Sequence, residues 1–290
     1  MSILVTKTVE NGCRTLLPYD ELSLSDIPCL LQNMGWHTAA ALMNHWFSTK
    51  PAFKMSDKLR NKYILGKAID IPVAHYNDSI VKMAWAIRYK QVQDAIDKLI
   101  NIKLANSASN EVIFSRLLNR NTMLLPKAKE FPIGYATSII DLDYTSQVNF
   151  IQFGGHFDTV DELRAANGAG NLELCIRGHY DLTGKKRRVV LDKIGFFIKD
   201  AYNFSGTYEP LGIWSRDGVL PFSQLHAYLG LFLMENWGQL YRRYKGYVPI
   251  FNDDFRRWQN THNEGGDYIA FSDVYWVDPP TKFKVINENS

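Results

Sequence analysis

The feature that most constrains the fold is a change, near residue 130, in the spacing of the apolar residues. Before this point apolar side chains recur every three or four residues, most regularly over residues 92–99, which is the period of a helix with one buried face. After it, short runs of alternating apolar and polar residues are separated by glycine-containing turns, as in half-buried strands. The sequence therefore predicts an α+β protein, with a mainly helical part over residues 1–130 and an antiparallel β-rich part over residues 131–290. The β-rich part is expected to form a sheet or a partly open barrel, and the two parts can also make one continuous domain.

One hairpin is predicted in detail within the β-rich part. Residues 172–177 alternate between apolar and polar types, a polar turn follows at residues 181–184, and the chain returns through residues 189–191. The next run, residues 194–198, alternates in the opposite phase, which a regular strand cannot do. We therefore expect a bulge or break close to Gly195.

Two helices outside the hairpin are marked by their ends. One is expected over residues 36–47, because a proline follows and the residue before a proline avoids the helical region. The other is expected to begin at Asn252, a good N-cap, and to end at a pair of glycines, after which residues 268–274 alternate as a final strand. Residues 211–247 are rich in aromatic side chains but have no sustained period, so the sequence does not place their elements.

Composition and motifs exclude several kinds of site. The chain has 33 basic and 30 acidic residues and a net charge of +3, which is too balanced to predict a nucleic-acid partner. It contains no run of about 18 apolar residues, so no transmembrane segment is expected. Neither a His-Glu-x-x-His motif nor a Gly-rich phosphate loop is present, and we expect no metal and no cofactor.

The cysteines and the first ten residues indicate in which compartment the chain folds. Cys13, Cys29 and Cys175 are odd in number and lack Cys-x-x-Cys spacing, which predicts reduced thiols rather than a disulfide framework. Residues 1–10 lack the charged and apolar regions of a secretory signal. We therefore expect the chain to fold in the cytoplasm of the producing cell, and any export to use a route without a signal peptide.

Three stretches together carry a resemblance to a known family. They are Ala-Leu-Met-x-x-Trp-Phe at residues 41–47, Ile-Gly-Phe-Phe-Ile-Lys-Asp-Ala-Tyr-Asn-Phe at 194–204, and Asn-Asp-Asp-Phe-Arg-x-Trp at 252–258. In this order and spacing they resemble an uncharacterised bacterial family, a domain of unknown function often encoded beside type VI secretion spike proteins. The resemblance covers most of the chain. It implies a role in competition between bacteria, as an antibacterial effector or an accessory protein, and it implies no catalytic residue.

A second, local resemblance supplies candidate catalytic residues. Asp200, Tyr202 and Asn203, followed by Phe204, are similar to the Asp-x-Tyr-Asp-Phe stretch of colicin-M-type toxins, which cleave the lipid-linked peptidoglycan precursor. Such chemistry requires a carboxylate that activates water or assists departure of the phosphate. The chain departs from that pattern, because Asn203 replaces the second aspartate and the His-Arg pair is missing. A polar turn after a strand explains the same residues without any function.

Two charged groups are candidate binding sites. The first lies at the predicted hairpin tip and could seat a phosphate or an anionic head group, although a solvated tip also explains it. Its members are His179, Lys185, Lys186, Arg187 and Arg188.

The second candidate is Arg256 with Asp267. Its alternative is a buried structural ion pair in which Arg256 joins the C-terminal helix to Asp267 or Asp273. The sequence favours the structural pair over a role in chemistry.

Three functions remain open at this level. The first is a type VI secretion-associated antibacterial toxin whose β-rich half carries the activity. The second is an adaptor or immunity-type protein whose aromatic-rich residues 214–247 dock on a secreted toxin or spike component. The third and weakest is a colicin-M-like hydrolase. The expected partners are accordingly a cognate immunity protein, a toxin or a secretion spike protein.

Overall fold

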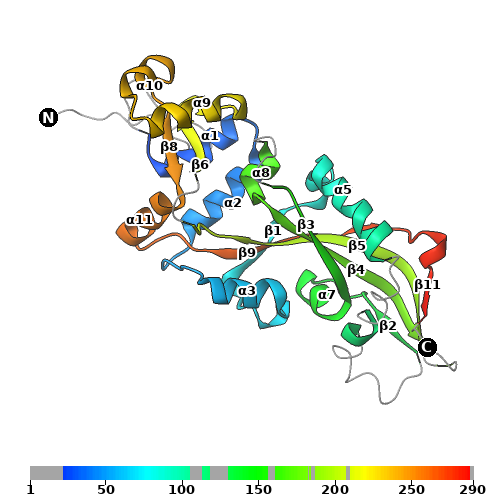
Figure 1. The fold of residues 1–290 in the computed structure, drawn as a ribbon. Helices are drawn as coiled ribbons and strands as arrows, with labels where there is room; N and C mark the ends of the chain where they lie inside the picture. The colour runs from blue at the N-terminus through cyan, green and yellow to red at the C-terminus, as the bar shows by residue number, and fades with distance from the viewer. Residues whose placement is uncertain are drawn as a thin grey trace. The chain divides into compact units, whose positions relative to one another are not determined.

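The computed structural model describes residues 22–104, 113–117, 130–155, 161–181, 183, 187–206 and 210–287 (Figure 1). The chain divides into two compact units. Unit 1 comprises Met1–Met55, Phe157–Ala166 and Tyr202–Asp267, and unit 2 comprises Ser56–His156, Asn167–Ala201 and Tyr268–Ser290. Each unit thus takes residues from both sides of residue 130. The fold is mixed α+β, with N-terminal helices, a mostly antiparallel curled sheet that resembles half a barrel, and a second small sheet.

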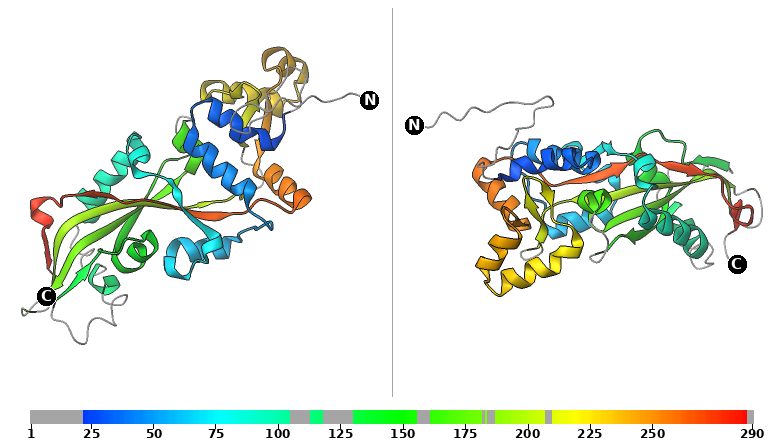
Figure 2. Two further views of the ribbon diagram at one scale, coloured as in Figure 1. Left: turned by 180° about the vertical axis from the view of Figure 1, so that it is seen from behind. Right: turned by 90° about the horizontal axis from the view of Figure 1, so that it is seen from above.

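The large sheet of unit 2 has eight strands and is built around β5 (Figures 1 and 2). Its main order is β1-β9-β5-β4-β2, while β10 and β11 also pair with β5, and β3 also pairs with β4. Strands β1 and β9 pair in parallel. The strands are β1 (Tyr76–Val81), β2 (Glu130–Ile133), β3 (Gln147–Phe153), β4 (Gly170–Asp181), β5 (Arg188–Tyr202), β9 (Tyr268–Ser272), β10 (Tyr275–Val277) and β11 (Val285–Asn287).

The predicted hairpin is confirmed, and its irregularity is three residues from the expected place. Strands β4 and β5 pair antiparallel from Asp181 opposite Arg188 onward. Arg177 faces Lys193 and Gly178 faces Leu191, so Asp192 is the extra residue of a bulge. The bulge therefore lies between the two runs of opposite phase, ahead of Gly195 rather than at it.

The helices of unit 2 include α3 (Asp57–Leu65), α4 (Met83–Ala86), α5 (Lys90–Lys98) and α7 (Ile139–Ser146), and a π-helical turn at Leu99–Lys103 extends α5. The predicted stripe on α5 is confirmed, because Val92, Ala95 and Leu99 are buried. Both α5 and α7 contact β3 and β4.

Unit 1 is organised around Trp46, a fully buried residue of α2 (His37–Ser48). The Trp46 ring meets Phe204 and Phe255 edge to face, with ring centroids 4.9 and 5.7 Å away. Phe255 belongs to α11 (Asn252–His262), so the two predicted helices, α2 and α11, are both confirmed. The other helices of unit 1 include α1 (Ile27–Asn33) and α8 (Glu162–Asn167), whose last residue belongs to unit 2.

Residues 210–251 form the part of unit 1 that the sequence did not resolve. They contain a small sheet of order β7-β6-β8, formed by β6 (Pro210–Ser215), β7 (Gly218–Val219) and β8 (Val248–Phe251). Two helices, α9 (Phe222–Leu233) and α10 (Trp237–Arg243), contact each other beside it. Their common core contains Ile213, Leu220, Tyr228, Leu240 and Tyr244.

Two local expectations are wrong. The start of α11 is satisfied by Asp254, whose carboxylate accepts from the Phe251 N–H at 2.8 Å, while the Asn252 amide donates to the Ser205 carbonyl at 2.6 Å. Asn252 is therefore not the cap. Among the cysteines Cys175 is a free buried thiol, as expected, but Cys29 is disulfide-bonded.

Candidate functional site

Asp200, the predicted catalytic carboxylate, lies near the end of β5 and is 8% exposed. Burial raises its pKa to about 7, although hydrogen bonds from the Ala201 N–H and the Asn167 and Asn171 side chains favour the charged form. The Asn171 amide donates to it at 3.3 Å. A carboxylate that activates water must reach its substrate. The buried position of Asp200 therefore gives the hydrolase interpretation no support, and a catalytic role stays a prediction.

Tyr202 and Asn203 belong to unit 1, whereas Asp200 belongs to unit 2. The Tyr202 ring meets Phe204 edge to face at 5.8 Å, and burial raises the pKa of its phenol. The Asn203 amide nitrogen is buried without a hydrogen-bond partner among the described groups. The three predicted catalytic residues are thus divided between the two units.

The predicted basic tip is described only in part, because Lys185 and Lys186 lie outside the described residues. Arg188 forms an ion pair with Asp181, with its Nε 2.5 Å from the carboxylate. Hydrogen bonds from Thr183 and then Arg188 hold the pKa of Asp181 at about 2. His179 and Arg187 are half-buried, and His179 pairs across the hairpin with Val190. An anion site at this tip remains a prediction.

Arg256 and Asp267 form the structural pair that the sequence favoured. Arg256 Nη1 and Nη2 donate to the two carboxylate oxygens of Asp267 at 2.9 and 2.6 Å, in a bidentate arrangement. Arg256 Nε donates to the Phe204 carbonyl at 2.8 Å, and Asp267 also accepts from Trp46 Nε1 at 3.0 Å and the Met55 N–H at 2.9 Å. Both groups are buried and extensively bonded, which fits the predicted structural role.

A buried polar network in unit 2 was not predicted. Lys199 Nζ lies 3.1 Å from both carboxylate oxygens of Asp143, and it also donates to the Gly66 carbonyl at 3.2 Å. Nearby, Gln147 donates to Glu173 at 2.7 Å, and burial, followed by the charge of Asp143, raises the pKa of Glu173 to about 8. In the sequence, the sign of this network is that two strand residues, Glu173 and Lys199, are charged. Asp143 is 56 positions from Lys199, so no local pattern links these two residues.

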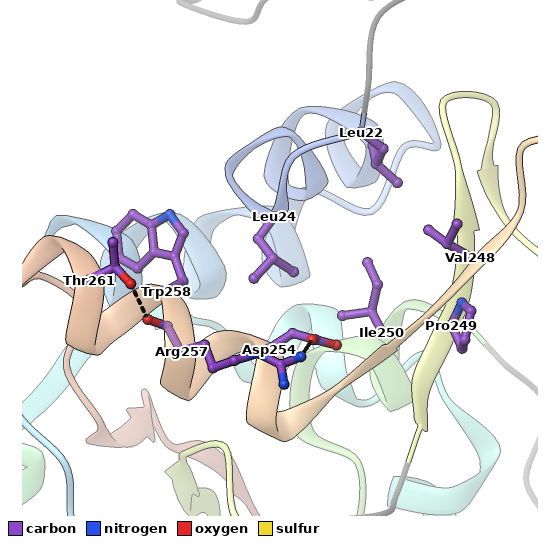
Figure 3. A pocket seen from close by; sticks show the side chains of 9 residues that line it. All are labelled: Leu22, Leu24, Val248, Pro249, Ile250, Asp254, Arg257, Trp258 and Thr261. Atoms are coloured by element: carbon purple, nitrogen blue, oxygen red, sulfur yellow. Dashed lines mark hydrogen bonds and ion pairs between the residues drawn. The ribbon is translucent and has the colours of Figure 1, made fainter.

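An accessible pocket of about 370 Å³ lies in unit 1 between α11 and β8 (Figure 3). Its walls are mainly apolar, and Asp254 and Arg257 form an ion pair on the α11 side. The Thr261 hydroxyl donates to the Arg257 carbonyl at 2.9 Å beside it. The lining residues are Leu22, Leu24, Val248, Pro249, Ile250, Asp254, Arg257, Trp258 and Thr261.

The pocket adjoins a sheet edge. In the part of the chain that is described, β8 is the end strand of the small sheet and pairs with β6 alone. Pro249 lies in β8, and prolines in sheets are found on edge strands because they lack an N–H. Val248, which precedes it, is exposed, and both residues line the pocket. Strand edge and pocket together are suited to an extended peptide.

The chain matches one known family over nearly all of its length. Residues 22–287 match the model of a family of unknown function (DUF6402). The chain belongs to this family. The match confirms the coarse expectation of a domain of unknown function that covers most of the chain. No curated protein and no solved structure matches.

Two kinds of feature are absent from the described part of this DUF6402 chain. Among the described residues, no group of three or more His, Cys, Asp or Glu side chains is arranged to hold a metal ion. None of the described helices has the length and apolar character needed to cross a bilayer.

Proposed function

We propose that the chain is a binding protein of the adaptor or immunity type, whose partner is a toxin or spike component of type VI secretion. The pocket between α11 and β8 is the observation that carries the binding role. The secretion context rests on the sequence resemblance, which places such families beside spike genes.

The chemistry of the pocket fits one apolar side chain of a partner. Leu24 and Trp258 form one side, and Val248 and Ile250 form the other (Figure 3). A volume of about 370 Å³ is near the lower end of the range of ligand sites. Apolar contact there would supply affinity, while the Asp254–Arg257 pair offers charges for orientation.

The edge of β8 could bind the main chain of the same partner. An extended peptide that adds to a sheet edge gains main-chain hydrogen bonds, and alternate side chains enter adjacent pockets. Pro249 has no N–H and can offer such a peptide only its carbonyl. The proposed partner segment is therefore extended and carries an apolar anchor.

The test is co-purification of the full chain with the proteins encoded beside it, followed by calorimetry on the complex. Val248→Arg should weaken the complex at least tenfold, because Val248 is 45% exposed and lines the pocket. Val285→Arg is the matched control, since Val285 is 42% exposed on β11. The binding role fails if no neighbouring protein forms a stoichiometric complex. Equal affinity of both variants would remove the pocket from the proposal.

An antibacterial effector is the second candidate, and an exposed apolar surface on α9 and α10 favours it. Four large apolar side chains of this region are open to solvent: Leu233, Met234, Trp237 and Tyr241. An effector should arrest growth when it is expressed in the target compartment. Harmless expression in both cytosol and periplasm would remove this candidate, and loss of toxicity in Asp200→Ala would instead support the colicin-M-like alternative.

A further inference from the structure

The α9–α10 tip, defined as Leu233, Met234, Trp237 and Tyr241, exposes an unusual set of side chains. Their exposed fractions are 79%, 80%, 57% and 67%, respectively. Single exposed apolar residues are ordinary, but a contiguous group marks an interaction surface. These four lie within nine residues of the chain: Leu233 ends α9, Met234 is its C-cap, and Trp237 and Tyr241 lie one turn apart on α10.

The tip is separate from the buried core of α9 and α10. Tyr228, Leu240 and Tyr244 already provide the buried face of the two helices, together with Ile213 and Leu220. The Trp237 ring also packs edge to face on Phe232, with centroids 5.5 Å apart, so its position is defined. The two helices therefore have a second apolar face, which is open to solvent.

The charges around the tip are nearly all positive. Arg242 and Arg243 lie in the last turn of α10, and Lys245 follows. Glu235 is the one carboxylate in the sequence between residues 222 and 247. None of the three cations forms an ion pair with a described carboxylate, and Lys245 Nζ lies 6.0 Å from the centre of the Tyr241 ring.

Exposed apolar side chains beside cations indicate which kind of partner the tip can bind. Trp and Tyr favour the boundary between water and hydrocarbon, where Arg and Lys side chains meet anionic head groups. A surface of four side chains is small for a stable protein complex, which usually needs more than about 1,000 Å² of buried area. Shallow insertion of a few apolar side chains, supported by nearby cations, is sufficient for a bilayer.

We propose that the α9–α10 tip inserts into the surface of a bilayer that contains anionic lipids. Leu233, Met234 and Trp237 enter the acyl boundary, and Arg242, Arg243 and Lys245 remain among the head groups. This goes beyond the proposed protein-binding role, because it concerns a different surface and a different class of partner.

The test is co-sedimentation of the full chain with vesicles of equal parts phosphatidylglycerol and phosphatidylcholine, and with vesicles of phosphatidylcholine alone. The wild-type chain should bind the anionic vesicles at least about tenfold better, and salt should weaken that binding. Leu233→Ser with Met234→Ser should reduce binding about tenfold or more, as should Arg242→Glu with Arg243→Glu.

The matched control removes two exposed apolar side chains elsewhere. Leu65 and Val73 are 69% and 78% exposed in unit 2, so Leu65→Ser with Val73→Ser should bind like the wild type. Val248→Arg should also keep vesicle binding, which separates this proposal from the pocket. Absence of wild-type binding, equal binding by the tip variant, or a dimer lost in that variant without vesicle binding would each overturn the proposal. Circular dichroism confirms that each variant is folded.

Discussion

The Arg256–Asp267 centre and the α9–α10 tip, both in unit 1, are opposite in burial: the centre buries charged side chains, and the tip exposes apolar ones. At the centre, two charged groups are buried, and described groups of unit 1 bond to both of them. At the tip, four large apolar groups are exposed, although the same helices already supply a complete buried face. Described groups of the same chain satisfy the centre, whereas the four side chains of the tip are open to solvent.

The comparison separates structural residues from candidate functional ones. A buried charge with good partners contributes to the fold, and removal of one partner leaves the other uncompensated. An exposed apolar surface contributes little to the fold, so its presence calls for a partner outside the chain. Substitutions in the two regions should therefore differ in what they change, with stability lost in the first and binding lost in the second.

The largest expected loss of stability is that of Arg256→Ala. It leaves Asp267 buried without its ion pair, and we expect a loss of about 3–5 kcal/mol in the free energy of unfolding. Chemical denaturation measures it. The neighbouring Arg257→Ala is the matched control, because Arg257 pairs with Asp254 at the surface, where such pairs contribute about 1 kcal/mol or less. Similar losses in both variants would break the comparison.

Lys199→Met extends the comparison to unit 2 and should have the next largest effect. It removes the partner of Asp143 in a site where Lys199 is 2% exposed, and we expect a loss of about 3 kcal/mol. Adding Asp143→Asn removes the uncompensated charge and keeps an acceptor for the Ala68 N–H. The double variant should recover part of the loss in the same denaturation assay. If it is no more stable than Lys199→Met, a buried charge is not the cause.

Glu173→Gln should have a smaller, pH-dependent effect. The folded protein holds the Glu173 proton up to about pH 8, whereas the ordinary value is 4.5, so stability from this group is full below pH 4.5 and is lost as pH rises through 8. Glutamine keeps an acceptor for Gln147 and cannot ionise. Between about pH 5 and pH 9, the unfolding free energy of the variant should fall by roughly 1–3 kcal/mol less than that of the wild type. Parallel pH profiles would show that Glu173 does not carry this dependence.

The smallest expected effect is that of Leu233→Ala at the tip. Because Leu233 is exposed, its unfolding free energy should stay within about 0.5 kcal/mol of the wild type. Leu240→Ala removes the same side chain from the buried face of α10 and should cost about 2–5 kcal/mol. Thermal unfolding of the pair tests the assignment of the two faces. Equal losses would mean that Leu233 belongs to the core.

The local pattern of the sequence was sufficient where one face of an element is buried. The stripe on α5 and the hairpin of β4 and β5 follow from period alone, and even the bulge at Asp192 was indicated by the change of phase. Helices α9 and α10 were missed because they have apolar residues on two faces, so no single period stands out.

The site was less predictable than the fold. The sequence suggested the Arg256–Asp267 pair because both residues lie in one short, polar stretch near the C-terminus. The pocket joins Leu22 and Leu24 to residues 248–261, and no local pattern signals such a distant combination. Asp200 was selected by resemblance, which carries no information about its burial.

The central position of β5 has a consequence for how the chain is made. Its neighbours β9, β10 and β11 are translated after it, and β1 pairs Tyr76 with Ile269. Strands β1 and β5 therefore each keep an unpaired edge until β9 has been translated. Such pairings form late and leave a nascent chain prone to association, which favours assistance by a chaperone.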